Sequence, residues 1–139
     1  MREERHSFTV DEANELLSQL KVALTTLRRS RDRLQELERK KAVEELAWLQ
    51  EDGSVSPQAQ TEIERLDQLQ QEEAHSFEEG LKAIHRTGAE LKDLSEGLID
   101  FPTQRGKEWV YLCWKEDEEK ISHWHDLESG FGGRRPIEQ

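Results

Sequence analysis

The sequence predicts a mainly α protein in which a long antiparallel helical hairpin, of the coiled-coil type, precedes a short antiparallel β-meander. An apolar seven-residue repeat runs without Gly or Pro from about residue 10 to 50, and a break containing Gly and Pro follows at 51–57. After Gly88 the repeat gives way to short alternating segments. We therefore expect a helical hairpin over residues 1–88 and a β-rich module over 89–139, packed on the open end of the hairpin.

The first helix is predicted from its start signal and its repeat. Thr9 is a suitable N-cap, and Glu12 completes a capping box three residues later. The helix is expected to run from about residue 10 to 50, because no Gly or Pro interrupts it. Its apolar seam comprises Leu16, Leu20, Ala23, Leu27, Ser30, Leu34, Leu37 and Trp48, with Lys41 at one step.

The second helix begins after a turn. Gly53 suits a left-handed cap, Ser56 an N-cap and Pro57 the first helical position. The helix is expected to continue to about Thr87 and to stop at Gly88. Folding back at Gly53 pairs residues whose numbers sum to roughly 107. The basic stretch 28–41 then faces the acidic stretch 66–79, and opposite charges on facing helices favour that pairing.

The C-terminal segments have the composition of strands. Residues 98–102, 109–114 and 121–125 are rich in aromatic and β-branched side chains and are separated by polar turns. Residues 89–92 supply a candidate edge strand. We therefore expect an antiparallel meander that holds most of the aromatic packing.

Composition and charge exclude several classes of protein. The net charge of −11 argues against a nucleic-acid binder and against attachment to anionic membrane surfaces. No apolar run approaches the roughly 18 residues of a membrane span. The first ten residues lack the apolar core of a signal peptide. Cys113 is the single cysteine, which excludes an internal disulfide and fits a cytoplasmic location.

Several short motifs resemble those of one family. The segments that carry the resemblance are Phe8–Asn14, Leu91–Asp93, Gly97–Pro102, Tyr111–Lys115, Glu118, Trp124–His125, Gly130–Phe131, Gly133–Arg134 and Pro136. Together they resemble the DUF2203 family, a prokaryotic family of unknown function. The resemblance places the family's histidine at His125 and implies no activity.

One group of residues in the C-terminal module is a candidate metal site. His123 and His125 are two apart on a predicted strand, so both face the same side. Cys113, Asp100 or Glu128 are available as further ligands. The alternative is that His125 hydrogen-bonds a loop, His123 is solvated and Cys113 is packed in the core.

Other patterns point to chemistry less specifically. A Cys113–His125 nucleophile pair lacks an identifiable orienting group or oxyanion hole. The Glu-x-x-His spacing at 72–75 occurs once, whereas di-iron bundles need two such pairs. The glycine-rich segment 130–136 lacks the lysine of a phosphate loop. Arg134 in that segment is expected to bind a carboxylate, which can be a side chain of the protein itself.

Two functions remain open from the sequence. The favoured one is a non-enzymatic, self-associating interaction or scaffold protein, because no complete catalytic set is present. We expect a homodimer, because one partner helix cannot cover the second apolar stripe at Leu17 and Leu24. The alternative is a small-molecule or metal-binding module with its site at Asp100, Cys113, His125 and Arg134. The sequence identifies no cofactor, catalytic residue or protein partner.

Overall fold

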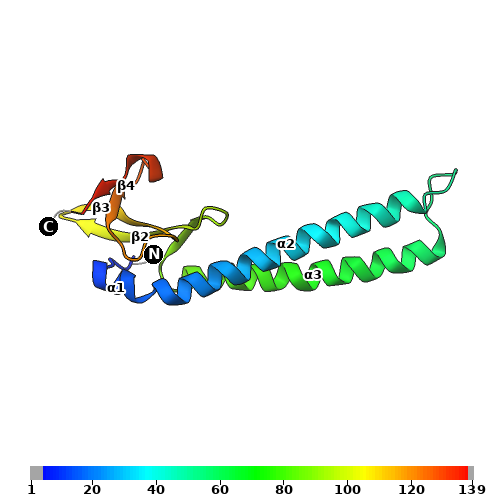
Figure 1. The fold of residues 1–139 in the computed structure, drawn as a ribbon, viewed down its shortest axis with the longest axis horizontal. Helices are drawn as coiled ribbons and strands as arrows, with labels where there is room; N and C mark the ends of the chain where they lie inside the picture. The colour runs from blue at the N-terminus through cyan, green and yellow to red at the C-terminus, as the bar shows by residue number, and fades with distance from the viewer. Residues whose placement is uncertain (1–4, 138–139) are drawn as a thin grey trace. The chain divides into compact units, whose positions relative to one another are not determined.

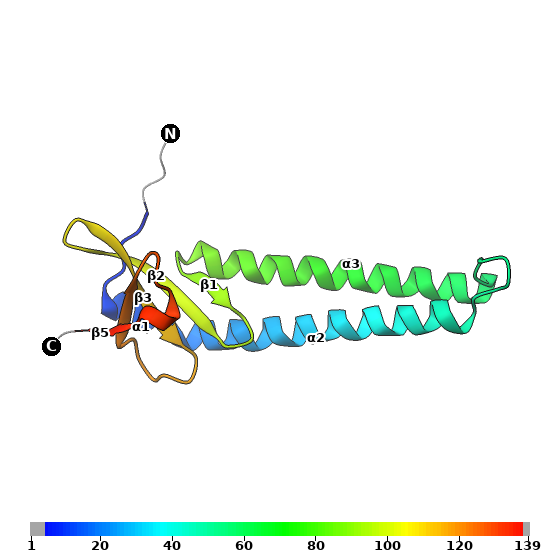
Figure 2. The same ribbon diagram turned by 90° about the horizontal axis from the view of Figure 1, so that it is seen from above.

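The structure is a computed structural model that describes residues 5–137. The helices are α1 (Val10–Glu15), α2 (Leu17–Ala47) and α3 (Pro57–Arg86); the strands are β1 (Glu90–Asp93), β2 (Leu98–Arg105), β3 (Glu108–Lys115), β4 (His123–Asp126) and β5 (Arg135–Pro136). A short 3-10 helix, η1 (Phe131–Gly133), lies between β4 and β5. Figure 1 labels the three helices with β2, β3 and β4, and Figure 2 adds the labels of β1 and β5. None of the helices in the described part of the chain has the length and apolarity that crossing a bilayer requires.

The described residues form two compact units. One unit is Leu27–Gly80, and the other combines the described residues up to Thr26 with those from Leu81 onward. The sequence places its boundary at residue 88. The first turns of α2 and the last turn of α3 instead belong to the unit that contains the sheet.

The N-terminal helix starts where the sequence predicts. Glu12 N–H donates to Thr9 Oγ1 at 3.0 Å, and Thr9 N–H donates to the Glu12 carboxylate at 2.8 Å. The prediction of one continuous helix to residue 50 is wrong. Leu16 N–H bonds the carbonyl of Ala13, three residues back, so α1 ends at Glu15 and a separate α2 begins at Leu17.

The unit Leu27–Gly80 is an antiparallel helical hairpin, shown by α2 and α3 in Figure 2. Lys41 Nζ donates to Asp67 at 2.9 Å and Ser30 Oγ donates to Glu73 at 2.6 Å. A Cβ added to Gly80 would lie 2.8 Å from Leu27 Cδ2, so the helices approach closely there. These pairs confirm the predicted register. Trp48 does not belong to the buried seam that the sequence predicts, because it is 51% exposed. The assignment of the hairpin as a coiled coil stays a prediction.

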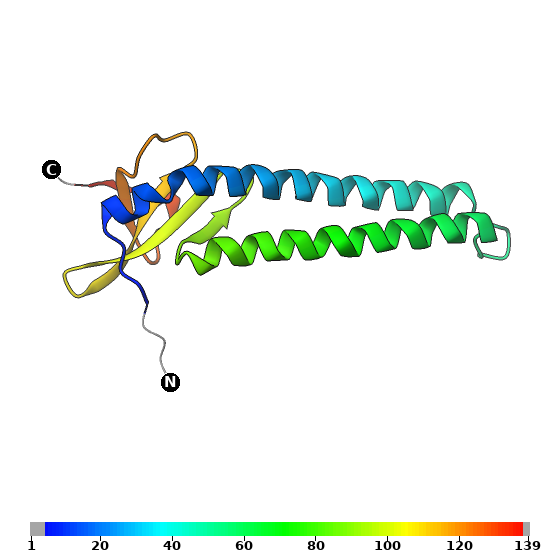
Figure 3. The same cartoon turned by 90° about the horizontal axis from the view of Figure 1, so that it is seen from below.

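The sheet is an antiparallel meander with strand order β1-β2-β3-β4-β5. It confirms the predicted meander, but β2 continues past residue 102 to Arg105 and β5 was not predicted. Pro102 is accommodated because the β1 ladder ends at Asp100. Beyond that point the N-terminal segment runs beside β2, as Figure 3 shows, and Phe8 N–H donates to the Pro102 carbonyl at 2.9 Å.

The third predicted strand begins later than residue 121. Ile121 N–H donates to Asn14 Oδ1 at 2.7 Å, so it is satisfied by α1 instead of by a strand. β4 therefore starts at His123. Asn14 thereby ties α1 to the segment that leads into β4.

The two faces of the sheet differ in chemistry. One face carries the fully buried apolar side chains Ile99, Phe101 and Trp114, and Phe8 packs edge-on against Phe101 with ring centroids 5.3 Å apart. The other face carries buried polar residues, among them Asp100 and His125. A buried polar face needs internal hydrogen bonds or a ligand.

The prediction that one partner helix leaves the stripe at Leu17 and Leu24 uncovered is wrong. Leu17 is 5% exposed and Leu24 is fully buried within the single chain. The stripe that the sequence left uncovered is therefore already covered, and a dimer needs another surface.

Candidate functional site

Three neighbouring strands bring Asp100, Cys113 and His125 together on the polar face. Asp100 of β2 is directly opposite Cys113 of β3, and His125 of β4 is opposite Tyr111 of β3. Alternation along β3 places Tyr111 and Cys113 on the same face. Asp100, Cys113 and His125 are 4%, 1% and 2% exposed, and one ligand atom of each lies within 4.8 Å of the others.

Both nitrogens of the His125 ring have partners. Nδ1 lies 2.7 Å from the carbonyl oxygen of Asp126, which only accepts, so Nδ1 carries a proton. Nε2 lies 2.9 Å from Asp100 Oδ2, and a proton must lie between these two atoms because two lone pairs would repel. A general base needs a free nitrogen toward its nucleophile. This geometry therefore disfavours a Cys113–His125 nucleophile pair.

The environment keeps Cys113 as a thiol. Burial and the neighbouring Asp100 carboxylate together raise the pKa of this thiol to about 12, and Arg134 opposes the shift. Burial also raises the pKa of Asp100, although His125 acts in the opposite direction. The group therefore holds two exchangeable protons at neutral pH: one on the thiol and one between His125 and Asp100.

We expect Cys113 to react far more slowly with thiol reagents in the native protein than in the unfolded one. A rise of three pKa units lowers the thiolate fraction about a thousandfold near neutral pH, and burial restricts access as well. The measurement is the rate of iodoacetamide labelling at pH 8, with and without urea. Comparable rates in the two states would contradict this description of the thiol.

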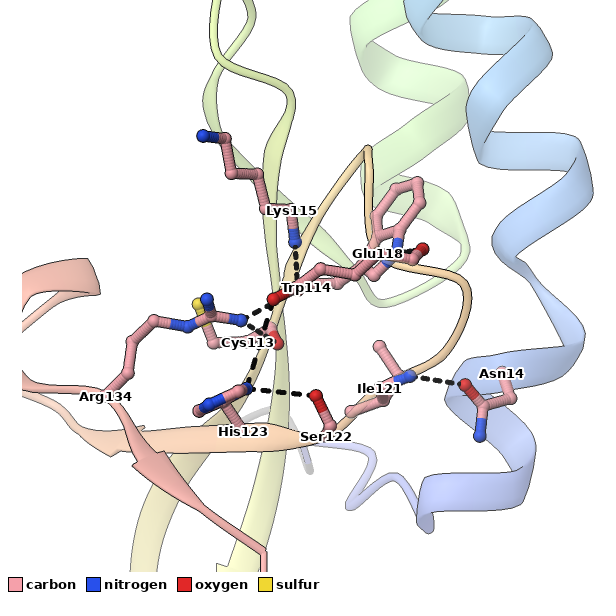
Figure 4. Close-up of polar contacts among 9 residues, drawn as sticks. All are labelled: Asn14, Cys113, Trp114, Lys115, Glu118, Ile121, Ser122, His123 and Arg134. Atoms are coloured by element: carbon pink, nitrogen blue, oxygen red, sulfur yellow. Dashed lines mark hydrogen bonds and ion pairs between the residues drawn. The ribbon is translucent and has the colours of Figure 1, made fainter.

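Arg134 of the C-terminal segment lies beside Cys113 and Glu118, as Figure 4 shows. Arg134 Nη2 donates to Glu118 Oε1 at 2.7 Å and to the Cys113 carbonyl at 3.3 Å. Burial raises the pKa of Glu118, but the hydrogen bonds from Arg134 and from Lys115 N–H outweigh it and hold this pKa below the usual value. Arg134 therefore binds a carboxylate of its own chain, as expected from the sequence.

Two of the residues proposed as metal ligands lie outside the group. His123 is opposite Cys113 in the register, but its Nδ1 lies 3.0 Å from Ser122 Oγ and 3.9 Å from Glu118. Glu128 is exposed, and its N–H donates to Asp126 Oδ1. The predicted metal pair of His123 with His125 therefore does not meet at one point.

Sequence reasoning missed the polar neighbours of the group. Tyr111 OH donates to Glu90 at 2.9 Å, and Lys92 Nζ lies 3.0 Å from the same carboxylate. The signal was present in the register: Tyr111 is two residues from Cys113, and Glu90 is opposite Asp100. By contrast, Glu72 and His75, which make up the Glu-x-x-His spacing, are both exposed.

The fold and the site define a helical-hairpin protein whose five-stranded meander carries a buried Asp–Cys–His group on one face. The chain belongs to the DUF2203 family: the model of this family, described as an uncharacterized conserved protein, matches residues 6–137. No curated protein and no solved structure matches the chain.

Proposed function

We propose that the protein binds one divalent transition metal ion, best zinc, through Asp100, Cys113 and His125. The observation that carries this proposal is the convergence of one oxygen, one sulfur and one nitrogen ligand within 4.8 Å. Zinc takes this ligand set in tetrahedral geometry, and three protein ligands leave one position for water or another ligand. We assign metal binding as the activity and name no catalytic residue.

The balance of protons and charge supports metal binding at a buried place. Without metal the thiol is neutral, and the proton between His125 and Asp100 leaves that pair with a net charge of zero. A divalent ion that displaces the thiol proton and the His125–Asp100 proton again gives a sum of zero. Exchange of two protons for one metal ion therefore leaves no net charge to be stabilised in the interior.

The orientation of His125 also fits a metal ligand. Metal-binding histidines commonly donate their second N–H to a carbonyl or carboxylate, which directs the other nitrogen to the ion. Here Nδ1 donates to the Asp126 carbonyl, so Nε2 is the nitrogen that faces Asp100 and Cys113. The alternative is that the three residues bind no metal and form a structural hydrogen-bond network, which keeps the thiol proton and the proton between His125 and Asp100.

A titration with Co²⁺ and Zn²⁺ distinguishes these descriptions. We expect one ion per chain and, with Co²⁺, a thiolate charge-transfer band, because the sulfur must ionise to bind. Cys113→Ser should remove the band, whereas His75→Ala, which removes an exposed histidine elsewhere, should leave it unchanged. Absence of stoichiometric binding by the wild-type protein would refute the proposal.

We infer self-association as a second candidate function, now from a different surface. Val43, Leu46, Trp48 and Leu49 are each more than half exposed at the loop end of the hairpin. Apolar side chains gathered in this way favour an interface. We assign a second copy as the partner, because residues 39–45 carry adjacent basic and acidic side chains that an antiparallel copy can pair.

Light scattering over a concentration series is expected to show a dimer that Leu46→Glu dissociates, because the charge would be placed in an apolar contact. Val22→Glu is the matched control, since Val22 is similarly exposed and lies outside the loop-end cluster. A wild-type protein that stays monomeric throughout the series would contradict this function and leave the metal proposal unaffected.

A further inference from the structure

A cavity that is lined by none of the three proposed metal ligands lies beside Glu90, and we propose that it binds a small organic anion through Arg5 and Arg86. Its volume is about 500 Å³, within the range of small-molecule sites. Its lining residues are Arg5, His6, His85, Arg86, Thr87, Gly88, Ala89, Glu90 and Pro102. None of them belongs to the metal-ligand group, so this inference is independent of the proposed function.

The cavity is built by two chain segments that are far apart in sequence. The N-terminal segment is fixed on β2, where Phe8 N–H donates to the Pro102 carbonyl and Gln104 N–H donates to Ser7 Oγ. The turn after α3 lies against the same segment, and a Cβ added to Gly88 would be 3.0 Å from the Phe8 ring. Arg5 and Arg86 therefore line the cavity from two different chain segments, next to anchored backbone.

The charge of the lining is opposite to that of the protein. The chain carries a net charge of −11, yet the cavity gathers two arginines and two histidines against the single carboxylate of Glu90. That carboxylate already accepts hydrogen bonds from Tyr111 OH at 2.9 Å and from Lys92 at 3.0 Å. It is thus neutralised locally and repels an incoming anion less than an unpaired carboxylate would.

The basic side chains of the cavity differ in how many partners they already contact within the chain. His6 Nε2 lies 3.4 Å from the Glu12 carboxylate, and the Arg5 guanidinium lies 5.7 Å from the centroid of the Trp109 ring. Among residues 5–137 Arg86 has no carboxylate partner. Guanidinium groups bind phosphate and carboxylate oxygens through paired N–H donors. Arg86 with Arg5 supplies two such groups.

The rest of the lining leaves the arginines as the binding groups. Ala89 and Pro102 are apolar but buried, so the room for an organic body comes from the cavity volume of about 500 Å³. The backbone N–H groups of Thr87, Gly88 and Ala89 donate within the chain, to Ile84, His85 and Thr87. The C-terminal end of α3 carries the negative end of the helix dipole, which opposes an anion. Binding therefore depends on the arginine side chains.

The test is a calorimetric and Trp-fluorescence titration of the full chain with phenyl phosphate, benzoate and inorganic phosphate. Arg5→Gln and Arg86→Gln remove one cavity charge each. Arg29→Gln is the matched control, because Arg29 is exposed on α2 and does not line the cavity. Both arginine positions in the cavity are exposed, so these variants should fold as the wild type does.

We expect saturable binding of phenyl phosphate or benzoate, weakened about tenfold or more by Arg86→Gln and by Arg5→Gln and unchanged by Arg29→Gln. Tighter binding of phenyl phosphate identifies a phosphate ligand, and tighter binding of benzoate identifies a carboxylate ligand. The inference is overturned if the wild type binds neither organic probe below about 10 mM. It is also overturned if the cavity variants match the control, or if inorganic phosphate binds as tightly as the organic probes.

Discussion

Replacing His125 with alanine is expected to lower the free energy of unfolding by about 1–3 kcal/mol, the cost typical of leaving a buried polar group without its hydrogen-bond partner. His125 is 2% exposed, and its ring bonds Asp100 at 2.9 Å and the Asp126 carbonyl at 2.7 Å. Without the ring, the Asp100 carboxyl group stays buried and loses its hydrogen-bond partner. Urea unfolding of the metal-free proteins, with chelator present, measures the difference.

Two further variants separate this effect from a general loss of packing. His123→Ala alters the same strand and the same face, but His123 is partly exposed and bonds only Ser122 Oγ closely, so a loss of about 1 kcal/mol or less is expected. His125→Gln retains an N–H donor for Asp100 and should recover part of the lost stability. An alanine variant as stable as the wild type would show that the Asp100–His125 pair contributes little.

Zinc affinity is expected to fall about 100-fold for each unit by which the pH is lowered near neutrality, because each ion displaces two protons. The pKa of the Cys113 thiol is raised to about 12, so this proton is bound throughout the physiological range and competes with metal at every pH below that value. The proton between His125 and Asp100 is the second competitor. Competition with a chelating dye from pH 6 to 8 measures the slope.

Comparing the pH dependence of zinc affinity between the wild type and a Cys113 variant identifies which proton is released. In Cys113→Ser the serine hydroxyl does not ionise, so the slope should decrease to about tenfold per pH unit while binding weakens. Calorimetry in buffers of different ionisation enthalpy counts the released protons directly. A wild-type affinity that does not depend on pH would be incompatible with a thiolate ligand.

Local signals in the sequence predicted much of the fold. The Thr9–Glu12 capping box, the turn at Gly53 and the hairpin register depend on neighbouring residues and on a short connection, so they were predictable. The break at Leu16 was not, because it follows no Gly or Pro. β5 has only two residues, too few for a periodic pattern.

The candidate site was predicted in part for the same kind of reason. Asp100, Cys113, His125 and Arg134 were named from residue type and from strand alternation, and the structure places them next to one another. His123 and Glu128 fitted the same argument and lie elsewhere. Residue type alone does not predict the orientation of the His123 ring or the exposure of Glu128.

The sequence by itself determined the helical hairpin, the meander and the family, because capping, periodicity and turn chemistry act over a few residues. Only the tertiary structure decided which polar side chains share a buried face. That decision depends on strand register, since a slip of one residue would move Asp100 to the apolar face and separate it from His125. The tertiary structure also decided that Leu17 and Leu24 are buried within the chain, because burial depends on contacts between segments distant in the sequence.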